Sequence, residues 1–138
     1  MATVKKIYDM AIHLMDEQSE SSGATETVDT EEYKFRTISI LNGVIPALRP
    51  YSEKPWKDRT AAILYAADYK NPRFDQEIPL DDTLCFALLP LYLAGMLLSS
   101  ENEDLSALFM NRYDRAFLDL RNKLPAEFEP IKPVYGLF

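Results

Sequence analysis

Apolar residues recur at three- and four-residue intervals in three stretches of the chain, and this spacing predicts three amphipathic helices. The first is expected to begin after Thr3, whose hydroxyl suits a helix N-cap, and to end near Gln18. Its apolar face comprises Ile7, Tyr8, Ala11, Leu14 and Met15. Such a stripe is typical of a helix that packs on one side only.

The second predicted helix begins after Asp29 or Thr30, and its first turn contains two acids, which the helix dipole favours there. Pro46 and Pro50 are expected to bring it to a close. Its apolar face comprises Phe35, Ile38, Leu41, Ile45 and Leu48.

The last predicted helix begins at Ser100 or Asn102 and has the longest apolar stripe of the three. The residues of this stripe are Leu105, Leu108, Phe109, Tyr113, Ala116, Phe117, Leu120 and Leu124.

Between these helices, residues 83–98 include no charged side chain. A helix needs about 20 apolar residues to cross a bilayer core, so this run is too short to be a span. Acids flank it, Asp81 and Asp82 before and Glu101 after, where a span would have a basic anchor. We therefore expect a soluble protein with this helix at the centre of a bundle or at a subunit interface. Gly95 should let another helix approach it closely.

Three further segments show no helical periodicity. Residues 19–28 are small and acidic, which predicts a mobile loop, and 125–138 contain three prolines, which predicts an extended tail. Residues 51–80 could form a short helix and loop or a small β-hairpin. The predicted fold is all-α, a single domain over 1–138 with a small bundle of about four helices.

The net charge of −7 comes from one acidic stretch. Seven acids and no base lie between residues 16 and 32, while the other 15 acids and 15 bases cancel. A negative field repels phosphate, which disfavours sequence-independent nucleic-acid binding.

Cys85 is the only cysteine and cannot form a disulfide within the chain, and residues 1–17 contain no apolar core of signal-peptide length. Both features favour the cytoplasm.

The sequence offers few groups for catalysis. One histidine, His13, and one cysteine cannot supply a structural zinc site, and the four glycines form no phosphate-binding loop. We therefore expect no enzyme activity, no metal and no cofactor. Aromatic and apolar residues outside the predicted helices are instead the candidates for a subunit interface, namely Trp56, Tyr65, Tyr69, Val134, Tyr135, Leu137 and Phe138.

Four motifs in order resemble a known family: VKKIYDMAIHLMDE at the start, LNGVIPAL in the second helix, IPLDD before the apolar run and FMNRYD in the last helix. Together they are similar to the small helical head-to-tail connector (adaptor, or neck) proteins of tailed bacteriophages and prophages. The resemblance implies a structural virion-assembly subunit that forms a homo-oligomeric ring beneath the portal and joins the DNA-filled capsid to the tail.

The same resemblance implies the portal protein and tail-side connector proteins as partners, DNA passing through without sequence-specific binding, and no membrane. It places the chain in the bacterial host cytoplasm during assembly and then in the virion neck. Two alternatives stay open. The acidic stretch suggests a DNA mimic, and His13 with the aromatic residues suggests a small cytosolic regulatory or ligand-binding helical protein.

Overall fold

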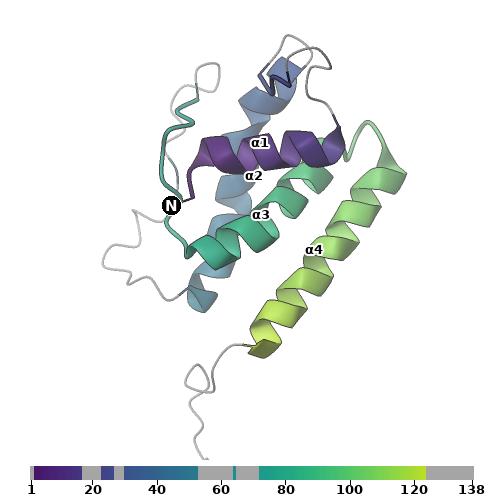
Figure 1. Cartoon of the computed structure of the whole chain (residues 1–138). Helices are drawn as coiled ribbons and strands as arrows, with labels where there is room; N and C mark the ends of the chain where they lie inside the picture. Colours follow the sequence, from purple (N-terminus) through teal and green to yellow (C-terminus); the bar gives the residue numbers. More distant parts are fainter. Residues whose placement is uncertain (1, 17–22, 27–29, 53–63, 65–71, 124–138) are drawn as a thin grey trace, which may run out of the picture.

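The computed structural model describes residues 2–16, 23–26, 30–52, 64 and 72–123. Along the chain these form α1 (Val4–Met15), α2 (Glu31–Leu48), the short 3-10 helix η2 (Arg49–Tyr51), α3 (Asp82–Leu97) and α4 (Glu103–Lys123) (Figure 1). The described residues contain no strand, only an isolated bridge between Thr3 and Glu77. The predicted all-α bundle is confirmed.

Helix α3 is the centre of the bundle and contacts each of α1, α2 and α4. It contains nearly all of the uncharged run of residues 83–98. Its apolar residues are distributed around the helix, and they are buried because other helices pack on several sides of it. Its buried residues are Leu84, Cys85, Leu88, Leu89, Pro90, Leu93, Ala94, Gly95 and Leu97. In the part of the chain described, no helix is both long enough and apolar enough to cross a membrane.

Helix α4 approaches α3 closely at Gly95, as expected. A methyl group on Gly95 would lie 2.6 Å from the sulfur of Met110 on α4, so only glycine fits this spacing without a shift. One turn earlier on α4, the buried Ser106 donates a hydrogen bond of 2.7 Å from its hydroxyl to the Gly95 carbonyl. This bond satisfies a carbonyl in the last turn of α3, where no intrahelical partner is available.

The same end of α3 is bound by a cation from α2. The guanidinium of Arg36 donates to the carbonyls of Met96 at 3.2 Å and Leu97 at 3.4 Å. Positive charge is favourable at a helix C-terminus because the last carbonyls carry the negative end of the helix dipole. Arg36 thus fixes α2 against α3 through both hydrogen bonding and charge.

The N-terminus of α1 is completed by a segment distant in sequence. Thr3 is the N-cap as predicted, and its hydroxyl accepts from the N–H of Lys6 at 3.3 Å. The bonds between the two segments are Val4 N–H to Gln76 O (3.0 Å), Lys5 N–H to Phe74 O (2.9 Å) and Ile78 N–H to Ala2 O (2.9 Å). Residues 74–78 therefore satisfy helix donors that have no intrahelical partner. Most of the segment 51–80, for which a short helix or a hairpin was considered, lies outside the described residues.

Several helix details differ from the prediction. Helix α1 ends at Met15 because Asp16 turns into the left-handed region (φ 59°), and α2 continues past Pro46 to Leu48. Leu14 and Leu108 were placed on buried stripes but are 41% and 43% exposed. Leu14 lies at the flank of the packed face of α1, where the gap to α3 widens.

Candidate functional site

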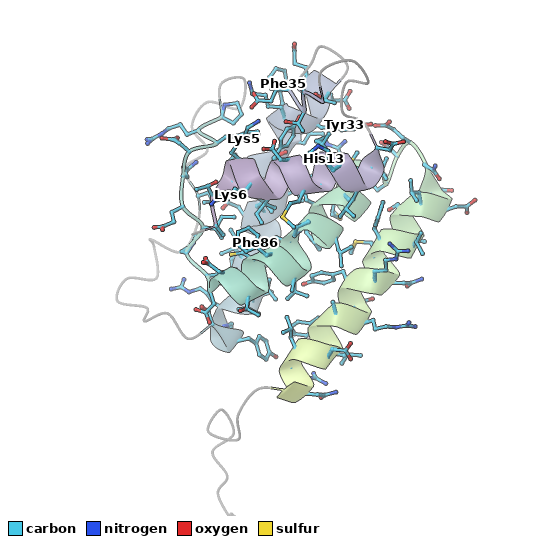
Figure 2. The ribbon with its side chains drawn as sticks, in the orientation of Figure 1. Lys5, Lys6, His13, Tyr33, Phe35 and Phe86 are labelled. Carbon is cyan, nitrogen blue, oxygen red and sulfur yellow. The ribbon has the colours of Figure 1, made fainter. Side chains whose placement is uncertain are left out.

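The main candidate site is an apolar groove between α1 and α3, with a volume of about 470 Å³. Its lining residues are Met10, His13 and Leu14 from α1 and Phe86, Ala87, Pro90 and Leu91 from α3. His13 and Phe86, labelled in Figure 2, mark its two sides. We call this surface the α1/α3 groove.

The groove exists because two helices cross without closing over each other. Met10 and Leu14 follow each other at one-turn spacing on α1 and are 38% and 41% exposed. Phe86 and Leu91 on α3 are only half-buried beside them. A contiguous apolar surface of this kind is typical of a binding site for a protein segment. His13 is the only ionisable residue of the lining.

A second, smaller hollow of about 140 Å³ lies where α4 ends beside η2 and the start of α3. It is lined by Tyr51, Asp81, Thr83, Leu84, Phe117, Leu120 and Arg121. Asp81 is already held by Ser52, whose hydroxyl donates to its carboxylate at 3.0 Å. The polar groups at this hollow thus serve the junction between η2 and α3.

Aromatic rings fill the space between α3 and α4 next to this hollow. Tyr92 and Tyr113 have ring centroids 5.2 Å apart, and Phe117 contacts Tyr51 edge-on at 5.2 Å. Burial, with smaller contributions from Tyr92 and Asp114, raises the pKa of Tyr113 to about 12. Tyr113 therefore stays neutral at physiological pH and acts as a packing residue.

A polar cluster holds residues 23–26, part of the loop predicted over 19–28, against α1. The Glu26 carboxylate lies 2.7 Å from the ammonium of Lys5 and 3.1 Å from that of Lys34. The hydroxyl of Thr25 donates to Asp9 at 2.6 Å. Glu26 is thus a paired acid, although it belongs to the acidic stretch.

These contacts shift the pKa values within the cluster. The hydrogen bond from Lys5 holds the pKa of Glu26 below its ordinary value, against a smaller opposing effect of burial, and Lys34 adds to the lowering. For Lys5, burial lowers the pKa, but the hydrogen bonds and charges of Glu26 and Asp9 together outweigh it and raise the pKa overall. Both shifts favour the charged forms, so the cluster is a set of ion pairs near neutral pH.

The remaining reactive side chains lie apart from one another. His13 is exposed on α1, and Cys85 is buried in α3 with its sulfur 3.7 Å from the Leu80 carbonyl. Among residues 2–16, 23–26, 30–52, 64 and 72–123, no three His, Cys, Asp or Glu side chains gather as metal ligands. The most open apolar feature among the described residues is the α1/α3 groove.

The interface candidates taken from the sequence all lie outside the described residues: Trp56, Tyr65, Tyr69, Val134, Tyr135, Leu137 and Phe138. They stay predictions. The α1/α3 groove was missed because Leu14 was assigned to the packed face of its helix and Met10 was not considered. No local signal marks the groove, because periodicity shows which residues share a face but not how far a neighbouring helix covers it.

Comparison with known proteins yields no match: no family model, no curated protein and no solved structure aligns with this chain.

Proposed function

We propose that this chain is a structural subunit of the head-to-tail connector of a tailed bacteriophage or prophage. The observation that carries the proposal is the α1/α3 groove, an apolar surface left open on a small helical subunit. A ring of identical chains needs heterologous contacts, in which one surface of each copy receives a different surface of the next. The groove supplies one such surface.

The motifs behind the resemblance support the proposal through their positions in the fold. In the LNGVIPAL motif, Leu41, Ile45 and Leu48 are buried. In the IPLDD motif, Ile78 and Leu80 are fully buried, and the carboxylate of Asp82 accepts a hydrogen bond from the N–H of Ala2 at 3.1 Å. These two motifs therefore contribute buried residues to the core, which is what a family of structural subunits would share.

The alternatives have less support. A DNA mimic needs an array of acids that is free to face a basic cleft, but Glu26 is neutralised by Lys5 and Lys34. A ligand-binding protein needs polar groups that converge on its pocket. The lining of the α1/α3 groove has His13 as its one ionisable side chain.

Deleting the gene from the phage or prophage that carries it tests the proposal. The expected result is DNA-filled heads and separate tails that fail to join, seen by electron microscopy, because no connector links them. A plasmid copy of the wild-type gene should restore infectious particles. If infectious particles form at normal titre without the gene, the chain is not a connector subunit.

A further inference from the structure

We infer that the α1/α3 groove receives the C-terminal segment 133–138, with the sequence PVYGLF, of a neighbouring copy of the chain. The inference rests on the proposed function in one respect: it takes the occupant from another subunit of the ring instead of from the same chain. It goes beyond the proposed function by naming the two surfaces in contact between subunits, the α1/α3 groove of one copy and residues 133–138 of the next.

The chemistry of the groove selects an uncharged apolar occupant. Six of its seven lining residues are apolar, and none is an acid or a lysine or arginine. A charged side chain buried there would lose its hydration with no ion-pair partner, which is costly. The segment 133–138 contains no charged side chain and ends in Val134, Tyr135, Leu137 and Phe138 around a single glycine. The groove is open to solvent, so the terminal carboxylate of Phe138 can stay in water while the side chains dock. The groove volume of about 470 Å³ is in the range of pockets that enclose drug-sized ligands, about 300–1,000 Å³.

Other parts of the chain fit the groove less well. The exposed Leu118 on α4 has exposed Asp114, Arg115 and Asp119 near it on the helix, so docking that face would bury charges against the apolar lining. Residues 60–67 form another uncharged stretch, but Leu64 is buried and bound to Asn42 of α2 by two hydrogen bonds of 2.7 and 3.1 Å. Leu64, at the middle of that stretch, is thus already bound to α2.

The length of the segment allows it to reach another copy. Helix α4 ends at Lys123, and 15 residues follow it. An extended chain spans about 3.3 Å per residue, so residues 124–138 reach up to about 50 Å. This exceeds the length of α4 itself, about 32 Å for 21 residues. Pro125, Pro130 and Pro133 reduce the conformational freedom of the segment in its free state, which lowers the entropy lost on docking.

Disulfide trapping between two different full-length variants tests the inference. One variant has Ala87→Cys in the groove, and the other has Leu137→Cys and an affinity tag that makes the mixed dimer distinguishable by mass. After mild oxidation of an equal mixture, the mixed dimer should exceed each homodimer by well over the twofold ratio that random pairing of equal amounts gives. Native Cys85 is buried and should not react, which the wild-type chain under the same conditions verifies.

The matched control replaces Ala87→Cys by Leu118→Cys, an exposed position on α4. This control should give no more mixed dimer than random collision.

A second measurement follows the binding of a fluorescent peptide of residues 126–138 to the full chain by fluorescence polarisation. Ala87→Glu should weaken its binding at least tenfold and Leu118→Glu should leave it unchanged, with circular dichroism verifying that both variants are folded.

Three results would overturn the inference: no mixed dimer, equal trapping at Ala87→Cys and Leu118→Cys, or a chain with both Ala87→Cys and Leu137→Cys that links only to itself. The experiment needs no phage, so its failure is separable from that of the proposed function. Trapping in the purified protein together with normal particle assembly after gene deletion would reject the connector role alone.

Discussion

Glu26 shows how a single residue of an acidic stretch can stabilise the fold. Its carboxylate bridges Lys5 on α1 and Lys34 on α2, so the ion pairs connect a loop to two helices. Because the pKa of Glu26 is lowered in the folded state, its contribution to stability is present above its ordinary pKa of 4.5 and is lost as the pH falls through the lower folded value. The partners are partly exposed, which limits the size of the effect.

We predict that Glu26→Gln lowers the free energy of unfolding by up to about 1 kcal/mol at neutral pH, the usual upper range for solvent-exposed pairs. The difference from wild type should shrink as the pH falls through the lowered pKa of folded Glu26 and disappear once the wild-type carboxyl is protonated as well. Urea unfolding at neutral pH and over a series of acidic pH values measures it. Glu77→Gln is the control, since Glu77 is exposed and has no ion pair among the described residues. An equal loss in both variants, or one that persists in acid, would show that the pairs of Glu26 are not its cause.

At the scale of elements, the contact between α3 and α4 depends on the absence of a side chain at Gly95. A larger residue there would collide with Met110, whose sulfur would lie 2.6 Å from an added methyl group and whose backbone nitrogen would lie 3.5 Å away. The methionine side chain can move, but the two backbones cannot separate without loss of the packing around Phe109.

Gly95→Val should therefore lower the free energy of unfolding by about 1–3 kcal/mol, the usual cost of overpacking. Adding Met110→Ala should recover part of this loss, because it empties the space that valine would take, so the double variant should lose less than the sum of the two single variants. Gly43→Ala on α2 is the matched control. No atom lies within 4 Å of an added methyl group there, so it should gain about 0.5–1 kcal/mol from helix propensity. Denaturant unfolding of all four variants gives the comparison, and additive losses would refute a direct contact.

The limits of the helices could be predicted where a local chemical signal sets them. Thr3 and Asn102 are N-caps whose side chains accept from the backbone three residues later, and both were expected from sequence. The exposure of Leu14 and Leu108 could not be predicted, because periodicity shows which residues share a face but not how far a neighbouring helix covers that face. For the same reason the sequence did not reveal the α1/α3 groove.

At the scale of the whole molecule, the described residues build their core around α3. The pairing of residues 74–78 with 2–5 closes one end of this core. This pairing could not be predicted from the residues of either segment, because backbone hydrogen bonds between distant segments depend on the path of the chain and not on residue type. The uncharged sequence of α3, in contrast, predicted either the centre of a bundle or a subunit interface, and the contacts of α3 with α1, α2 and α4 confirm its central position.

The tail, residues 124–138, lies outside the described residues, and its separability from the stability of the fold is a prediction. We predict that deleting residues 131–138 leaves the helical circular dichroism unchanged and the thermal midpoint within about 2 °C of wild type, because the buried residues of α1 to α4 all remain. The same deletion should abolish incorporation into the connector, since it removes the segment inferred to enter the neighbouring groove. Particles assembled from the truncated gene should resemble those of the gene deletion under electron microscopy.

Lys132→Gln is the matched control for this truncation, because it alters the tail but leaves its apolar residues in place. It should assemble normally. Val134→Ser with Leu137→Ser should behave like the truncation while keeping the chain length, since two apolar side chains that gain from leaving water would be lost. A truncated chain that melts many degrees earlier as a monomer would mean that the tail covers its own bundle. In that case the groove of each copy would be filled from within, and the contact between subunits would have to lie elsewhere on the molecule.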